Sequence, residues 1–153
     1  MPFSLDTSGI LDAWTRHYPI DVFPTIWSHM HTAALTGEIL VIDEVVLELK
    51  RKDDGICEWV QDRQNMIVPI DSDIQANLTK IMKSYPRLVD TRKQRSGCDP
   101  WVIALAQARN LTVVTGEKST GSLNRPKIPD VCRDLGLRSI EIIDFFRLQG
   151  WKI

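Results

Sequence analysis

Short apolar runs alternate with longer amphipathic segments along this 153-residue chain. The short runs are rich in β-branched residues, as buried strands are, and lie at 2–5, 39–42, 66–70, 112–115 and 139–143. Most segments between them carry apolar residues three or four positions apart, which is the spacing of one helix face. Strands that alternate with helices build βαβ units, so the pattern predicts an α/β fold with a central parallel sheet.

Polar residues at the expected helix starts support this alternation. Four helices have residues that can cap their first turn, and these are Asp21, Asp43, Asp71 or Ser72, and Asp99. Shorter helices are predicted around 56–60, 128–136 and 144–149. The triplet 7–9 (Thr-Ser-Gly) has the composition of a turn, and the stretch 116–129 fits neither a strand nor a helix, so we expect a loop there.

Composition and charge narrow the classes of function. The length predicts a single domain over 1–153, and the hydrophobic (43%) and charged (25%) fractions are those of a globular protein. A net charge of −1 means that any nucleic-acid binding depends on a local basic patch. The sequence has neither a membrane-spanning apolar run nor a signal peptide, which predicts a cytoplasmic protein. Cys57, Cys98 and Cys132 are odd in number and widely spaced, so we expect free, buried thiols.

Four acidic residues stand where a strand ends or a helix lies next to it: Asp6, Glu48, Asp99 and Glu117. The carboxyl ends of parallel strands line one crevice, so these side chains are expected to converge. Converging carboxylates repel one another unless a cation neutralises them, and carboxylate oxygens suit Mg²⁺ or Mn²⁺. We therefore predict a metal-dependent phosphodiesterase. Three of these acids also have ordinary interpretations when taken alone, since Asp99 is a good N-cap and the two glutamates are ordinary solvated charges. Asp6 directly follows the first strand and is harder to explain in this way.

Basic residues gather in three places, at 50–52, at 92–95, and at Lys118 with Arg125 and Lys127. The ordinary role of such residues is a solvated helix end or loop. Beside an acidic crevice, cations at the rim can instead hold a polyanion. The candidate phosphate contacts are Lys50, Arg51, Arg92, Lys93, Arg95 and Lys118.

Four segments in order resemble a PIN-domain nuclease, above all the VapC-like toxin ribonucleases of toxin–antitoxin pairs. They are LDTSGILDAW, VIDEVVLELK, CDPWVIALA and TVVTGEKS. Two further segments, YPIDVFPTIW and KIPDVCRDLG, resemble one poorly characterised PIN subgroup. The resemblance covers essentially the whole chain and implies a three-layer α/β/α sandwich with a central parallel sheet.

The resemblance also implies roles for individual residues. Matched by position, the acids that hold one or two Mg²⁺ or Mn²⁺ ions are Asp6, Glu48, Asp99 and Glu117. Thr7, Ser8 and Thr115 would orient these carboxylates or a water molecule. The sequence departs from the family at two of these positions: Ser8 stands where Asn is frequent, and Glu117 where Asp is usual. Both departures concern whether the protein holds a second metal ion.

The activity implied by the resemblance is endonucleolytic cleavage of RNA. The partners implied are a cognate antitoxin, with a segment lying across the crevice, and a second copy of the chain, for which the aromatic stretch 23–34 is a candidate surface or simply core. Two alternatives remain open from the sequence. One is a catalytically degenerate PIN domain that binds RNA or protein, and the other is a phosphatase-like domain with Asp6 as a covalent nucleophile.

Overall fold

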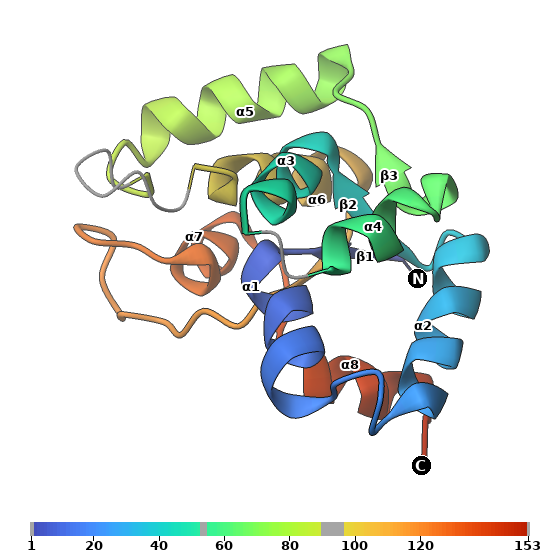
Figure 1. Ribbon diagram of the computed structural model, residues 1–153. Helices are drawn as coiled ribbons and strands as arrows, with labels where there is room; N and C mark the ends of the chain where they lie inside the picture. The colour runs from blue at the N-terminus through green and yellow to red at the C-terminus, as the bar shows by residue number, and fades with distance from the viewer. Residues whose placement is uncertain (1, 53–54, 90–96, 153) are drawn as a thin grey trace.

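The computed structural model describes residues 2–52, 55–89 and 97–152, and its centre is a five-stranded sheet (Figure 1). The strand order is β3-β2-β1-β4-β5, and every pairing is parallel. The strands are β1 (Phe3–Leu5), β2 (Ile39–Ile42), β3 (Ile67–Val68), β4 (Thr112–Val114) and β5 (Ser139–Ile140). The parallel sheet predicted from the alternating pattern is therefore confirmed.

Helices cover both faces of this sheet. In chain order they are α1 (Thr7–Leu11), the π-helix η1 (Asp12–His17), α2 (Pro24–Leu35), α3 (Asp43–Lys52), α4 (Ile56–Gln61), the 3-10 helix η2 (Gln64–Met66), α5 (Ser72–Ser84), α6 (Asp99–Arg109), α7 (Ile128–Leu135) and α8 (Ile142–Gln149). Helix α6 packs on β1, β2 and β4, with α5 against it, while α1, α2 and α8 lie on the opposite side (Figure 1). The three-layer α/β/α sandwich is thus confirmed. Within the described ranges, no helix has the length and apolar character needed to cross a membrane.

Burial on both faces explains why the strands are apolar throughout. Parallel sheets covered by helices are buried on both sides, so their strands do not alternate between apolar and polar residues. All residues of β1, β2 and β4 are buried, and even the polar Ser4 lies inside, where its hydroxyl donates to the Val102 carbonyl oxygen (3.2 Å). The ring of Phe3 packs edge-on against Phe145 of α8. All three cysteines are free and buried, as predicted.

The start of the chain differs from the prediction. Residues 7–9, expected to be a turn, begin helix α1, whose first turn closes with the Ile10 amide donating to the Asp6 carbonyl oxygen (3.2 Å). Ile10 and Ala13 are fully buried, so core packing stabilises a helix in a segment of poor intrinsic propensity. Gly9 permits this packing, because a Cβ there would lie 3.0 Å from the Val114 carbonyl oxygen.

The other predicted helix and strand boundaries agree with the structure in part. Asp71 is an N-cap, and its carboxylate accepts a hydrogen bond from the Ile74 amide (2.9 Å). The prediction for Asp21 is wrong, since α2 begins at Pro24 and its N-cap residue is Phe23. Asp43 is the first residue of α3. The last predicted strand is also too long: β5 ends at Ile140, and α8 has already begun at Ile142, which is buried in the core.

Candidate active site

The strand order places a crevice at the carboxyl ends of β1 and β4. The order runs 3-2-1 in one direction and 4-5 in the other, so it reverses between β1 and β4. In open α/β sheets, ligands bind at the carboxyl ends of the strands at such a switch point. Asp6 directly follows β1, and Glu117 follows β4 by three residues. The topology thus brings these two acids to the two walls of the crevice.

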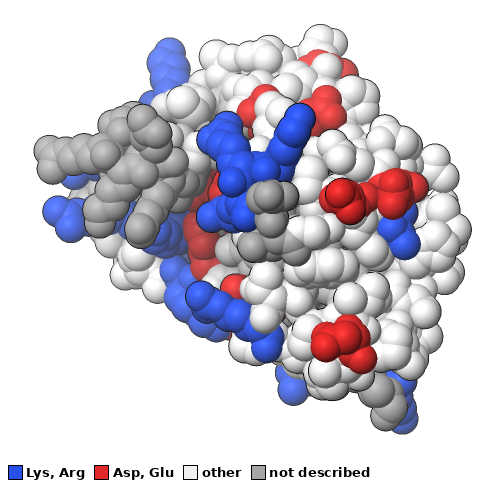
Figure 2. All heavy atoms as spheres, viewed as in Figure 1, with Lys and Arg blue, Asp and Glu red and all other residues white. Residues whose placement is uncertain are grey.

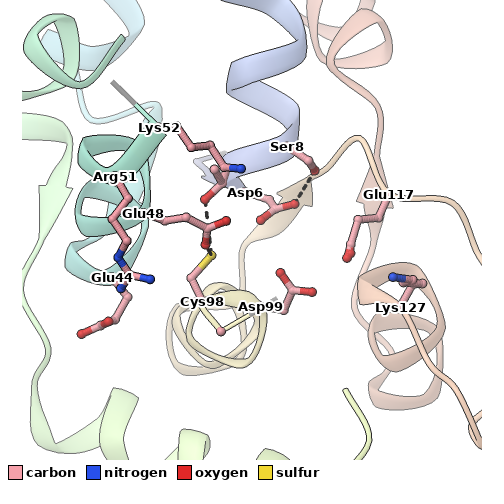
Figure 3. Close-up of a pocket in the computed structure, with 12 residues that line it drawn as sticks. Asp6, Ser8, Glu44, Glu48, Arg51, Lys52, Cys98, Asp99, Glu117 and Lys127 are labelled. Atoms are coloured by element: carbon pink, nitrogen blue, oxygen red, sulfur yellow. Dashed lines mark hydrogen bonds between the residues drawn. The ribbon is translucent and has the colours of Figure 1, made fainter. Parts of the chain in front are cut away.

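A cleft of about 620 Å³ opens at this point (Figure 3). Its lining residues are Asp6, Thr7, Ser8, Glu44, Glu48, Arg51, Lys52, Gly97, Cys98, Asp99, Glu117 and Lys127. All four acids proposed from the sequence are among them, and they come from the ends of β1 and β4 and from helices α3 and α6. The structure therefore brings together side chains that lie up to 111 positions apart in the sequence.

Two hydroxyl groups orient the carboxylate of Asp6. The hydroxyls of Ser8 (2.6 Å) and Thr115 (2.8 Å) both donate to its Oδ2 atom, which leaves Oδ1 available to a ligand. The same hydroxyls accept hydrogen bonds from the loop after β4, Ser8 from the Gly116 amide (2.9 Å) and Thr115 from the Glu117 amide (3.1 Å). Ser8 and Thr115 thus lie where an orienting role requires them to be. The hydroxyl of Thr7 contacts the Cys98 sulfur instead (3.3 Å).

Burial and mutual repulsion act on the carboxylates of the cleft. Asp6 is only 2% exposed, and burial together with repulsion from Glu117 and Glu48 raises its pKa from 3.8 to about 6, although the Ser8 and Thr115 hydrogen bonds oppose the shift. Both carboxylate oxygens of Glu117 are buried, and neither has a hydrogen-bond partner within the described part of the chain. A cation at this point would stabilise both charges.

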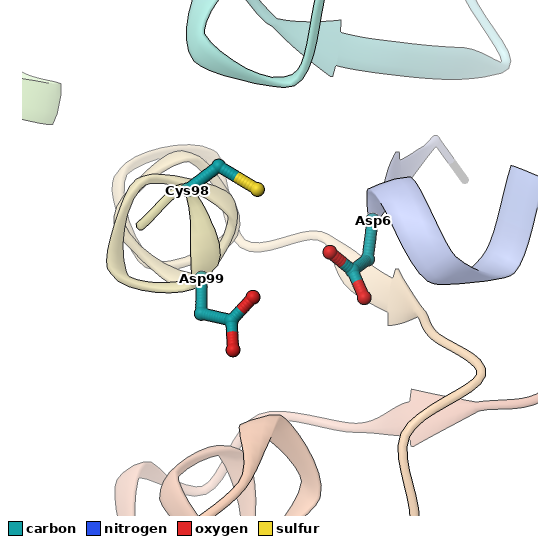
Figure 4. Close-up of side chains that lie close together, drawn as sticks. All are labelled: Asp6, Cys98 and Asp99. Carbon is teal, nitrogen blue, oxygen red and sulfur yellow. The ribbon is translucent and has the colours of Figure 1, made fainter. Parts of the chain in front are cut away.

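The donor set fits a hard divalent cation. Ligand atoms of Asp6, Cys98 and Asp99 all lie within 4.8 Å of one another (Figure 4), and Asp99 is only 5% exposed. Carboxylate oxygens of this kind suit Mg²⁺ or Mn²⁺. Asp6 and Asp99 are therefore the carboxylates that could hold such an ion together, whereas Glu48 and Glu117 line the same cleft but do not belong to this close group.

Cys98 is a cleft residue that the sequence did not reveal. Its thiol donates to Glu48 Oε2 (2.5 Å), and burial, followed by the charge of Asp6 and this hydrogen bond, raises the pKa of the thiol far above its usual range. Cys98 thus contacts the Glu48 carboxylate from the start of α6. The only hint in the sequence is its position directly before Asp99, and it occupies the N-cap of α6 that was predicted for Asp99.

Cations surround this acidic hollow (Figure 2). Arg51 and Lys52 reach it from the end of α3, and Lys127 reaches it from the residue before α7 (Figure 3). Among the other candidate phosphate contacts, Lys50 is exposed but does not line the cleft, and Lys118 forms an ion pair with Glu141, so the roles of both stay predictions. Arg92, Lys93 and Arg95 lie outside the described residues.

Comparisons with known proteins agree with this architecture. The family model of a domain of unknown function, DUF4411, matches residues 3–153. No curated protein matches the chain. Among solved structures, a chain of the crystal structure of FitAcB from Neisseria gonorrhoeae has a TM-score of 0.55 at 15% identity, covering 94% of this chain and 99% of that chain. At this identity the likeness concerns the fold, and it agrees with the PIN-like sandwich expected from the sequence.

Proposed function

The chain belongs to the DUF4411 family, and from the geometry of its cleft together with its resemblance to VapC-like toxins we propose that it is a metal-dependent endoribonuclease, the toxin of a toxin–antitoxin pair. The observation that carries this proposal is the convergence of four carboxylates from four separate elements on one cleft. Burial raises the pKa of Asp6, repulsion from Glu117 and Glu48 acts in the same direction, and the hydrogen bonds from Ser8 and Thr115 oppose both. Such a cluster is costly without a cation, which favours a metal site over a structural role.

The roles of the acids follow from their contacts. Asp6, Glu48, Asp99 and Glu117 would hold Mg²⁺ or Mn²⁺. A bound divalent cation supplies a Lewis acid that polarises the scissile phosphate and makes water a stronger nucleophile at neutral pH.

The remaining polar residues hold the proposed ligands in position. Ser8 and Thr115 fix one oxygen of Asp6 by hydrogen bonds, and the Cys98 thiol fixes one oxygen of Glu48. The Glu117 backbone is tied to Thr115, so the fourth carboxylate is placed by the same network.

The rim of the cleft supports a phosphodiester substrate. Arg51 and Lys52 lie on one side of the acids and Lys127 on the other (Figure 3). A polyanion that crosses the cleft would therefore contact cations at both sides. Because the net charge of the chain is −1, this concentration of cations is local. That the polyanion is RNA, and that a cognate antitoxin and a second copy of the chain are partners, are proposals drawn from the resemblance to VapC-like toxins.

Cleavage of RNA by the purified protein tests the proposal. The assay compares Mg²⁺, Mn²⁺ and EDTA for the wild type, for Asp99→Asn, and for Asp73→Asn, a matched control at an exposed acid of α5. We expect metal-dependent cutting by the wild type and the control, and loss of cutting in Asp99→Asn. Cutting that survives both EDTA and Asp99→Asn would contradict the mechanism.

Two other results would point to the alternatives. A folded protein that binds RNA but neither cuts it nor binds Mn²⁺ in a calorimetric titration would indicate a catalytically degenerate binding module. A phosphoryl group trapped covalently on Asp6 would indicate a phosphatase. Each of these results differs from metal-dependent cleavage, so measurements of cleavage, of RNA and Mn²⁺ binding, and of phosphorylation at Asp6 distinguish the three functions.

A further inference from the structure

A buried carboxylate outside the acidic cluster holds the long loop between β4 and α7. Asp130, in the first turn of α7, is only 5% exposed. It accepts hydrogen bonds from the Ser119 hydroxyl (2.5 Å) and from the amides of Thr120 (3.0 Å), Gly121 (3.0 Å) and Lys127 (2.8 Å). The Thr120 hydroxyl also lies 3.1 Å from it, and shares its one proton among this carboxylate and two loop carbonyl oxygens. One side chain therefore binds both ends of the 119–127 loop.

The charge of Asp130 strengthens these contacts. Burial alone would raise the pKa of this carboxyl, but the hydrogen bonds from Ser119 and from the three backbone amides outweigh burial and hold the pKa well below its usual range. The group is ionised at any pH at which the protein would work, and hydrogen bonds to an ionised acceptor are roughly twice as strong as neutral ones. The loop is consequently tethered by a permanent charge.

Capping of α7 does not account for this arrangement. A residue in the first turn needs only the bond to the Lys127 amide to complete a capping interaction. The contacts with Ser119, Thr120 and Gly121 reach back nine to eleven positions and add nothing to the helix. They bind the part of the loop that directly follows Glu117.

The tethered loop carries groups of the cleft at both ends. Glu117 precedes the tethered segment by two residues, and its amide is fixed by Thr115. Lys127 ends the segment, and its side chain lies at the rim of the cleft, facing the acids from the α7 side (Figure 3). The Lys127 side chain is exposed, so its ammonium group is placed through its backbone. The Lys127 amide donates to the Asp130 carboxylate, and the Lys127 carbonyl oxygen accepts from the amides of Asp130 and Val131 at the start of α7.

We propose that Asp130 is a positioning residue, which tethers the 119–127 loop so that Lys127 stays at the rim of the cleft and contacts a phosphate of the substrate. The phosphate contact rests on the proposed function, whereas the tether does not. Asp130 touches neither the substrate nor the reacting atoms, and it acts through Lys127.

Amide hydrogen exchange tests the tether without any substrate. Asp130→Asn keeps the size of the side chain but removes its charge and one acceptor oxygen. The matched control is Asp134→Asn on the same helix, where the carboxylate bonds to the Tyr85 hydroxyl. We expect exchange at Thr120, Gly121 and Lys127 to become at least about tenfold faster in Asp130→Asn and to stay unchanged in the control. Unchanged exchange in Asp130→Asn would overturn the tether.

A double-mutant cycle then tests the link to Lys127. KM and kcat for cleavage of a single-stranded RNA are measured with Mn²⁺ over a series of salt concentrations, for Asp130→Asn, Lys127→Gln and the double variant. We expect each single change to raise KM by roughly threefold to tenfold, to leave kcat nearly unchanged, and to reduce the salt dependence by about one phosphate contact. The double variant should be no worse than Lys127→Gln.

The possible results separate the two proposals. Effects of Asp130→Asn and Lys127→Gln that multiply in the double variant would overturn the positioning role, since Asp130 would then act independently of Lys127. A lower kcat with unchanged KM would overturn it as well. A wild type that neither binds nor cuts RNA would overturn the proposed function, and with it the phosphate contact, while the exchange rates still decide the tether.

Discussion

Replacing Asp6 with asparagine should make the metal-free protein more stable at neutral pH, although it removes a proposed metal ligand. The carboxylate is buried against Glu117 and Glu48, and its pKa is raised from 3.8 to about 6. Asparagine has nearly the same shape, and its amide oxygen can still accept the hydrogen bonds from Ser8 and Thr115. The substitution therefore removes the destabilising charge and retains most of the packing.

The magnitude follows from the shift in pKa. The difference between about 6 and 3.8 is about 2 units, and each unit corresponds to about 1.4 kcal/mol of folding free energy, which gives about 3 kcal/mol. Because the pKa of this acid is higher in the folded state, protonation favours folding. This contribution is fully present below pH 3.8 and is lost as the pH rises through about 6.

Urea unfolding in EDTA, followed by the fluorescence of the five tryptophans, measures this effect. The free energies of unfolding of the wild type and of Asp6→Asn are compared from about pH 4 to about pH 8, beside the surface control Asp73→Asn. We expect Asp6→Asn to gain up to about 3 kcal/mol over the wild type across this range, and the control to follow the wild type. A difference that does not change with pH, or a wild type that is the more stable protein at pH 8, would refute the reasoning.

Addition of Mn²⁺ should reverse the order of stability. A ligand that binds only the folded state at a hundred times its dissociation constant stabilises by about 2.7 kcal/mol. The wild type should gain this amount, and Asp6→Asn much less, because one ligand is missing. The same substitution thus stabilises the metal-free protein and weakens the response to metal, a pair of results that a purely structural role of Asp6 does not produce.

Two further substitutions test the surroundings of the site and the fold. Thr115→Val removes one of the two hydrogen bonds to Asp6 Oδ2, so the pKa of Asp6 should rise further; the acidic limb of the rate–pH profile should then move to higher pH, and an unmoved limb would mean that Asp6 does not control it. Asp71→Ala removes the N-cap bond to the Ile74 amide and should cost about 1 kcal/mol in urea unfolding, with no change in RNA cleavage.

Much of the fold was predictable because strands that are buried on both faces have few polar residues. The run at 39–42 is apolar throughout, and the run at 112–115 has two valines between threonines. Neither alternates, which is the signature of strands covered on both sides, and they correspond to β2 and, as far as Val114, to β4. The end of the chain was less predictable. Ile142 and Ile143 have β-branched side chains that favour a strand, yet they begin α8, because Ile142 is buried in the core at the start of that helix.

Helix α1 could not be predicted from its local sequence, for a different reason. Thr7, Ser8 and Gly9 have poor helix propensity, and only Ile10 and Ala13 mark an apolar face. The glycine that suggests a turn is needed because the helix approaches the end of β4 too closely for a side chain. That reason lies in a strand more than a hundred positions away, so local composition could not disclose it.

Some residues of the candidate site could be predicted from the sequence, and others could not. Asp6, Asp99 and Glu117 could be proposed from their positions near strand ends and at a helix start, which require only the alternation of elements. Glu48 lies in the middle of α3 and was proposed because that helix follows a strand. Cys98 and Asp130 could not, since their roles depend on partners such as Glu48, 50 positions from Cys98, that meet only in the folded chain. Lys127 was grouped with other cations from the sequence, but its place at the cleft depends on the fold.

Asp99 illustrates how the strand order decides between two interpretations of one residue. From the sequence, an aspartate before a proline is a good N-cap, and capping alone would explain it. In the structure, Cys98 occupies the N-cap and Asp99 is the first helical residue, with its carboxylate facing Asp6 (Figure 4). The two residues meet because α6 leads into β4, the strand that lies next to β1 where the order of the sheet reverses. A sheet with another order would place Asp99 elsewhere, so the metal-site interpretation gains its support from topology, a property that no single motif contains.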